Sequence, residues 1–126
     1  MSIPNELLYT EEHEWILVDG DVATIGITDY AQSELGDIVY IEFPEVGSEV
    51  DQMDPFGSIE AVKAVEELYA PVSGEIIEVN TNLEDNFQMI NQDPYGDGWI
   101  IKIKVADPGE LEALLTAEQY AKKVGG

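Results

Sequence analysis

Residues 57–67 read Gly-Ser-Ile-Glu-Ala-Val-Lys-Ala-Val-Glu-Glu, in which apolar side chains alternate with carboxylates around a single cation. An alternation with a period of two predicts half-buried β-strands. We therefore expect strands over residues 56–61 and 65–69, joined by a tight connection at Val62-Lys63-Ala64. Lys63 would then lie at the tip of a hairpin.

Lys63 is the only lysine or arginine in the first 101 residues of a chain that has 27 acidic residues, five lysines and no arginine. A lysine at an exposed turn can be reached by a modifying enzyme from every side, while the hairpin holds it at a fixed position above a rigid sheet. Taken alone, however, Lys63 is more simply interpreted as an ordinary solvent-exposed turn lysine.

The length of 126 residues predicts one domain, residues 1–126, that buries about two thirds of the surface of its unfolded chain. The absence of cysteine excludes disulfides, thiolate metal sites and a cysteine nucleophile, and His13 is the only histidine. Residues 1–6 lack a basic leader segment, and no apolar run approaches the roughly 18 residues of a membrane span. We expect a cytoplasmic protein without a metal site.

The formal net charge of −22 and the pI near 4.1 would repel nucleic acids and anionic membranes, so we expect neither as a partner. Proteins with basic surfaces would be attracted instead. Solubility, for example in a salt-rich cell, explains the same charge equally well. Since 44% of the residues are hydrophobic and their spacing is regular, the chain is folded.

Short apolar runs separated by Gly, Pro, Asn and Asp indicate a mainly β sandwich or barrel. The dipeptide Asp19-Gly20 is expected to supply the positive φ angles of a hairpin turn between strands 13–18 and 22–27. Further strands are expected over residues 37–43, 75–79 and 99–105, and residues 48–53 are expected to form a short strand and a polar loop. In the last of these, one face would carry Trp99, Ile101, Ile103 and Val105.

Helix signals stand in two places. Thr28 can cap a short helix over residues 29–35, which Gly36 would end. Asp107 and Thr116 each precede a pattern that starts a short C-terminal helix. Residues 80–98 form a long polar connection in which we expect no strand.

Five segments, in this order and at this spacing, resemble the H protein of the glycine cleavage system: residues 26–31, 35–40, 60–64, 70–75 and 93–99. The resemblance extends from about Tyr9 to Tyr120. It implies a flattened barrel-sandwich hybrid of the lipoyl/biotinyl-domain type, with a short helix after the first hairpin and short C-terminal helices. Relatives with this fold carry Met-Lys-Met when they bind biotin and Asp-Lys-Ala in acyltransferase lipoyl domains, and Val62-Lys63-Ala64 fits neither.

The resemblance implies that Lys63 carries lipoic acid in amide linkage and that the protein is a non-enzymatic, monomeric carrier of one-carbon metabolism. In that family, a pyridoxal-phosphate glycine decarboxylase (P protein) passes an aminomethyl group to the lipoyl sulfur. A tetrahydrofolate-dependent aminomethyltransferase (T protein) then takes the one-carbon unit and releases ammonia. Dihydrolipoamide dehydrogenase (L protein) reoxidises the dithiol, and a lipoate ligase or octanoyl/lipoyl transferase attaches the cofactor.

A protonated amine on such an arm needs shelter from water beside a carboxylate, for which Glu12, Glu14 and Glu67 are candidates. In the family, the position of Glu14 in His13-Glu14-Trp15 belongs to a sheltering cleft. The alternative is that Glu14 is only a polar strand residue beside a buried Trp15. His13 is expected to be structural, because a carrier needs no base of its own.

The sequence departs from the family at three positions. Ala61 stands where serine usually precedes Val-Lys, which bears on how efficiently the lysine is lipoylated, and Phe87 and Met89 replace a proline and a leucine. Two other functions remain open. One is a repurposed relative that passes lipoate to other lipoyl enzymes or serves a different one-carbon or sulfur pathway, and the other is an interaction module with an unmodified hairpin. No phosphate loop, activated nucleophile or metal-ligand cluster indicates an enzyme.

Overall fold

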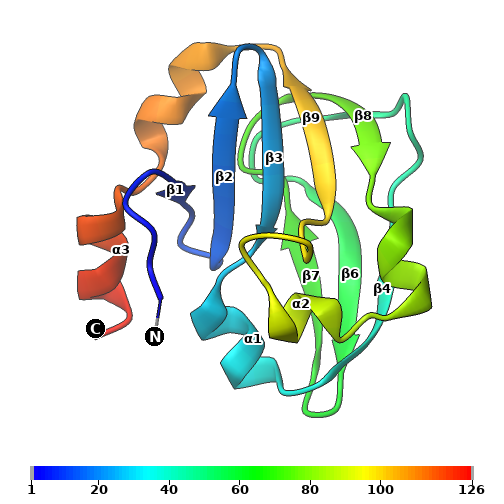
Figure 1. Ribbon diagram of the computed structural model, residues 1–126. Coiled ribbons are helices and arrows are strands. Elements are labelled where there is room, and N and C mark those ends of the chain that lie inside the picture. The colour runs from blue at the N-terminus through cyan, green and yellow to red at the C-terminus, as the bar shows by residue number, and fades with distance from the viewer. Residues whose placement is uncertain (1, 126) are drawn as a thin grey trace.

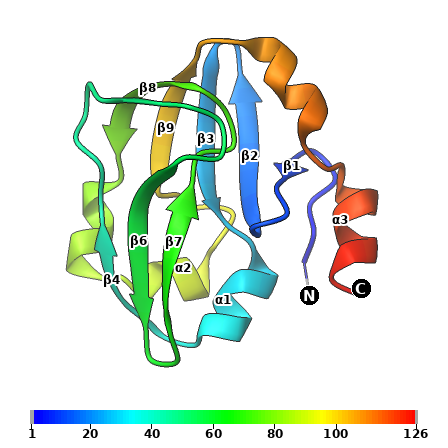
Figure 2. The same ribbon diagram turned by 180° about the vertical axis from the view of Figure 1, so that it is seen from behind.

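The computed structural model describes residues 2–125, and within them the strands form two antiparallel sheets (Figures 1 and 2). One sheet has six strands in the order β1-β2-β3-β9-β8-β5, and the other has three in the order β4-β6-β7. The strands are β1 (Leu8–Tyr9), β2 (Glu14–Asp19), β3 (Val22–Ile27), β4 (Ile38–Glu42), β5 (Glu49–Val50), β6 (Pro55–Ala61), β7 (Val65–Tyr69), β8 (Gly74–Val79) and β9 (Ile101–Val105).

The main core contains buried residues of both sheets. Ile16, Ile25 and Ile103 come from the six-stranded sheet, and Ile41 and Ile59 come from the three-stranded sheet. All five are at most 2% exposed, so their burial contributes hydrophobic stabilisation where the two sheets meet. The predicted mainly β fold of the flattened sandwich type is confirmed, with two sheets that are not closed into a barrel.

The first hairpin pairs β2 with β3 as predicted, but its turn begins one residue later than expected. Asp19 pairs with Val22, so Gly20 and Asp21 are the two connecting residues. Only Gly20 has a positive φ, of 65°, and Asp19 remains in the strand. A glycine at the first connecting position suits a tight hairpin turn, which explains why one positive φ angle is sufficient.

The predicted helix after the first hairpin is α1 (Asp29–Leu35). Its first turn is capped by Thr28, whose Oγ1 accepts the N–H of Ala31 at 3.1 Å. Its end is marked by Gly36, with a φ of 78° and an N–H that donates to the carbonyl oxygen of Gln32. Both predicted signals are confirmed, because each depends on neighbouring residues alone.

Residues 80–98 contain no strand, in line with the prediction, and instead fold into the 3₁₀ helix η1 (Thr81–Asp85) and the short helix α2 (Met89–Gln92). Leu83 and Ile90 anchor this segment in the main core. The following strand is shorter than predicted, because β9 begins at Ile101. Trp99 packs against a second core cluster and does not share the face of Ile101 and Ile103.

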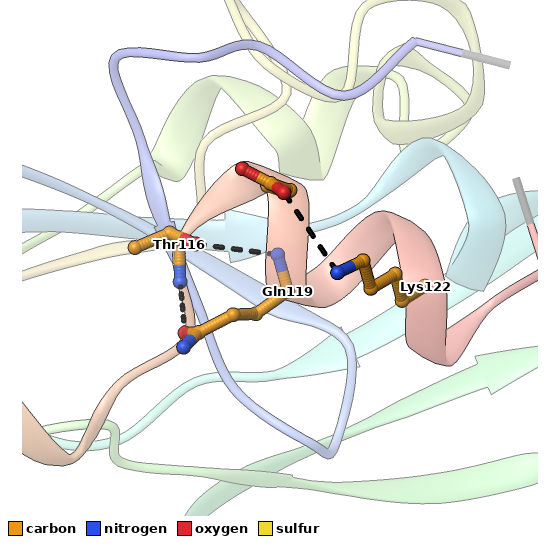
Figure 3. Close-up of polar contacts among 4 residues, drawn as sticks. Thr116, Gln119 and Lys122 are labelled. Atoms are coloured by element: carbon orange, nitrogen blue, oxygen red, sulfur yellow. Dashed lines mark hydrogen bonds and ion pairs between the residues drawn. The ribbon is translucent and has the colours of Figure 1, made fainter.

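The two predicted C-terminal helices are η2 (Pro108–Ala113), which is a 3₁₀ helix, and α3 (Ala117–Lys123). Thr116 and Gln119 form a reciprocal capping box at the start of α3, and Lys122 makes a 3.8 Å ion pair with Glu118 on the same helix (Figure 3). α3 contributes Tyr120 to the second core cluster, where its ring stacks on that of Tyr9 at 4.7 Å. Among residues 2–125, the helices are all too short or too polar to cross a membrane.

Candidate functional site

Lys63 lies at the turn between β6 and β7, where the hairpin reaches the lower edge of the molecule in Figure 1. Glu60 pairs with Val65 as the last pair of the ladder, and the N–H of Ala61 donates to the carbonyl oxygen of Ala64 at 2.9 Å. The side chains of Val62 and Lys63 are both exposed. The predicted hairpin and the predicted place of the lysine at its tip are therefore confirmed.

The backbone of the hairpin tip is held by the segment that connects α1 to β4. The N–H of Val62 donates to the carbonyl oxygen of Asp37 at 3.0 Å, and the N–H of Lys63 donates to that of Leu35 at 3.3 Å. The methylenes of Lys63 lie beside Gly36, since a Cβ built there would be 3.6 Å from Cγ and Cε of the lysine. The tip is thus fixed by neighbours outside the hairpin as well as by its own ladder.

Asn91 supports this connecting segment, a role that no pattern in the sequence predicts. Its Nδ2 donates to the carbonyl oxygen of Gly36 at 2.9 Å and to Oε1 of Gln32 at 3.0 Å, and its Oδ1 accepts the N–H of Ile38 at 2.9 Å. Asn91 lies on α2, more than 50 positions away from Gly36 and Ile38 along the chain. The one sequence signal near Asn91 is the family-like segment of residues 93–99, which begins two residues later.

The ammonium group of Lys63 is not engaged by a carboxylate. Across residues 2–125, the ion pairs are Lys102 with Glu78 and Lys122 with Glu118, and Lys63 takes part in neither. An exposed amine that is free of ion pairs on a fixed hairpin fits covalent attachment of an acyl group. A buried or paired lysine in this place would not have fitted it.

A cleft with a volume of about 350 Å³ lies beside the hairpin, between α1 and the strands β2, β3, β6 and β7. Its walls are apolar at Ile27, Ile59 and Leu68, and its aromatic side chains are His13 and Tyr30. The acidic residues that line it are Glu12, Glu14, Glu34, Glu66 and Glu67. All three carboxylates predicted to shelter an amine therefore line one cleft, and none of the lining residues is a lysine or an arginine.

Glu14 is the most buried of these carboxylates, with only 1% of its surface exposed. Its Oε1 accepts the hydroxyl of Thr10 at 2.8 Å and its Oε2 accepts the N–H of Tyr69 at 2.9 Å. Burial raises the pKa of Glu14 to about 8, although the hydrogen bonds from Tyr69 and Thr10 act against this rise. The carboxyl is thus held in place at the cleft wall, and an arriving cation would favour its charged form.

His13 turns the chain into β2 with a φ of 69°, a left-handed conformation that histidine adopts more readily than most residues. Its Nδ1 lies 2.9 Å from the hydroxyl of Tyr120, and its ring packs against Tyr30 at 4.8 Å. Burial lowers the pKa of His13, so its neutral form is favoured. These contacts join the cleft wall to α3 and agree with a structural role.

The cleft and the lysine hairpin share two elements. Leu35 at the end of α1 lines the cleft and also accepts the N–H of Lys63. Glu66 and Glu67 lie on β7, which begins two residues after Lys63, and both line the cleft. An arm attached to the lysine would therefore start close to the rim of the cleft.

Comparisons with known proteins agree over almost the whole chain. Residues 7–125 match the model of the glycine cleavage H-protein family. A glycine cleavage system H protein of Staphylococcus epidermidis is 52% identical over 125 residues, which cover 99% of each chain. The crystal structure of a glycine cleavage system H protein from Mycobacterium marinum is similar with a TM-score of 0.90 and 42% identity, over 98% of this chain and 100% of the other.

Proposed function

The chain belongs to the glycine cleavage H-protein family, and on this basis we propose that it is a lipoyl carrier whose cofactor is attached to Lys63. A member of this family is a carrier component of the glycine cleavage system and does not itself catalyse a reaction. The observation that supports Lys63 most strongly is its exposed, unpaired amine at the tip of a braced hairpin.

Lipoate supplies a disulfide that takes up the aminomethyl unit and the electrons of glycine when the group is bound. The protein's own contribution is to hold the attachment point of the arm in a fixed position. The hairpin and its supports at Leu35 and Asp37 fix the attachment point, so that a long arm samples each partner's active site at a high effective concentration. The acidic exterior keeps this carrier soluble at the same time.

We further propose that the cleft shelters a cationic amine carried on the arm, with Glu14 as its main carboxylate and Glu12 and Glu67 at the rim. Glu14 is held by Thr10 and Tyr69, and its burial removes competing water. An amine that reaches this carboxylate would gain a strong, poorly screened attraction. The apolar side chains Ile27, Ile59 and Leu68 would exclude water from the loaded end.

The partners implied by the family are the P, T and L proteins of glycine cleavage and an enzyme that attaches lipoate. We propose that the whole chain acts as one monomeric carrier domain and that it works in the cytoplasm. Basic docking surfaces on these partners would complement a net charge of −22.

Intact mass spectrometry tests the attachment. Protein purified from its own organism should carry one lipoyl adduct, and the Lys63→Arg variant, which keeps the charge, should carry none. An adduct that persists in the variant would place the cofactor elsewhere. Absence of any adduct on the wild-type protein would favour an unmodified interaction module.

Glycine–bicarbonate exchange tests the role. Exchange by glycine decarboxylase should require the lipoylated protein. The Lys63→Arg variant should not support exchange. A lipoylated protein that supports no exchange, but passes lipoate to other lipoyl enzymes, would instead be a relay.

A further inference from the structure

We propose that an apolar surface beside the hairpin, formed by Val39, Tyr40, Val62 and Val65 and called the collar below, is the docking site of the enzyme that acylates Lys63. This proposal rests on the proposed function, since it requires Lys63 to be the attachment point. It names a surface and a partner that the role of a carrier does not specify.

The collar depends on an irregularity in β4. The pairing of β4 with β6 shifts register between Ile38 and Tyr40, so that Val39 is an extra residue in the strand. Ile38 and Ile41 consequently both point into the core, with 1% and 2% exposure. Val39 and Tyr40, which lie between them, are both turned outward, with 46% and 52% exposure. A regular strand would have buried every second residue.

The other two members of the collar flank the lysine directly. Val62 and Val65 are 71% and 67% exposed, the highest values among the exposed large hydrophobic residues of the described chain. Tyr40 pairs with Glu60, and Glu60 pairs with Val65, so Tyr40 and Val65 stand on the same face of the three-stranded sheet. The N–H of Val62 donates to the carbonyl oxygen of Asp37, directly before β4, which brings Val62 to the same end of the sheet as Val39.

Apolar side chains gathered on one surface indicate a contact site, whereas scattered ones need no explanation. The remaining exposed large hydrophobic residues of the described chain lie on other elements: Leu17 on β2, Val46 in the turn before β5, Met53 before β6 and Ile77 on β8. They serve as natural controls. Only the collar adjoins the lysine.

The charged residues near the collar indicate what kind of partner surface would bind there. The exposed carboxylates of Asp37 and Glu42 lie beside the collar, and that of Glu60 lies between Tyr40 and Val65 on the middle strand of the sheet. Within the described residues, no lysine other than Lys63 lies on β4, β6, β7 or their connections. A complementary surface therefore combines apolar side chains with basic groups, one of them opposite Glu60 and others at the rim.

Among the possible partners, the acylating enzyme is the one that must approach Lys63 most closely. In acylation, the neutral amine of Lys63 attacks the carbonyl carbon of an activated acyl donor, the amide bond forms, the donor's leaving group departs, and a proton is released to water. This enzyme must bring its active site to Nζ itself and so must cover the residues beside Lys63. Partners that act later meet only the far end of the arm, so they can dock on other surfaces.

The test uses the full-length apo protein with three substitutions of similar shape, Val39→Thr, Val62→Thr and Val65→Thr. A control carries Leu17→Thr, Val46→Thr and Ile77→Thr, which change exposed apolar residues on other elements, with 43%, 59% and 36% exposure. The rate of adduct formation with a lipoate ligase, lipoate and ATP is followed by intact mass. We expect the collar variant to lose about tenfold or more in kcat/KM, mainly through a higher KM, and the control to lose little.

Four outcomes would overturn the collar as the acylation site. The first two are equal rates for the wild type and the collar variant, and a smaller loss than in the control. The third is a loss only of glycine–bicarbonate exchange after complete lipoylation, which would assign the collar to the decarboxylase. A wild-type dimer in sedimentation that the collar variant abolishes would assign it to a second copy of this chain. If the triple variant is unfolded by circular dichroism, the single Val65→Thr variant decides. Failure of the wild type to gain any adduct at Lys63 would instead reject the proposed function.

Discussion

The carboxylate of Glu14 on β2 accepts the backbone N–H of Tyr69 on β7 at 2.9 Å, and this hydrogen bond joins the six-stranded sheet to the three-stranded sheet. A charged group at 1% exposure is costly unless it is paired or neutralised. Glu14 has hydrogen-bond donors but lies in a cleft lined by further carboxylates, so burial dominates its titration. The same residue thereby connects the stability of the fold to the state of the cleft.

Stability should fall as the pH rises because of Glu14. Its pKa is about 8 in the folded protein against an ordinary value of 4.5, so the folded state holds a proton that the unfolded state releases. Between these two pH values, the free energy of unfolding should decrease by about 1.4 kcal/mol per pH unit through this group. The Glu14→Gln variant should lack this slope. Urea unfolding of both proteins from pH 5 to pH 9 measures the difference, and parallel pH profiles would contradict it.

Removing the hydroxyl of Tyr120 should loosen the link between α3 and the cleft. This buried hydroxyl lies 2.7 Å from Oγ1 of Thr28 and 2.9 Å from Nδ1 of His13. The Tyr120→Phe variant should lose about 1 to 3 kcal/mol of unfolding free energy, because the buried hydroxyl of Thr28 and the half-buried ring of His13 lose a partner. Tyr40→Phe, at an exposed tyrosine, should change it by less than about 0.5 kcal/mol. Equal effects in urea unfolding would show that the network carries no stability.

Features that depend on a few consecutive residues could be predicted from the sequence. The cap at Thr28, the end of α1 at Gly36 and the hairpin around Lys63 each follow from local chemistry. Trp99 was misplaced because the period-two alternation was extended beyond the strand, whereas this residue packs against the second core cluster. Alternation shows which residues can share a face, but it does not show where pairing stops.

Features that depend on contacts between distant segments could not be predicted. The 1% exposure of Glu14 arises only when β7 and Thr10 close over it, and no pattern around residue 14 specifies that neighbour. Likewise, the bulge at Val39 is visible only in the pairing with β6. The sequence also could not decide between two sheets and a closed barrel, because the order of the strands depends on the whole chain.

Gly57 is required by close backbone packing. A Cβ at this position would meet the carbonyl oxygen of Glu42 on the neighbouring strand β4, and backbone cannot move aside as a side chain can. The Gly57→Ala variant should therefore lose several kcal/mol, roughly 3 or more, of unfolding free energy. Gly47→Ala is the control. It has a φ of 97° but open space around it, so it should cost only about 1 kcal/mol. Similar losses in urea unfolding would argue against steric packing at Gly57.

Asn91 should matter more for the lysine hairpin than its distance along the chain suggests. The Asn91→Ala variant removes the side chain that binds Gly36 and Ile38, on either side of the carbonyl group that receives the Val62 N–H. We expect the amide hydrogens of Val62 and Lys63 to exchange about tenfold faster, because the segment that accepts their hydrogen bonds is released. Hydrogen exchange followed by NMR measures this, with Asn82→Ala, at an exposed asparagine, as the control. If exchange at the tip is unchanged while global stability falls, Asn91 supports the fold but not the hairpin.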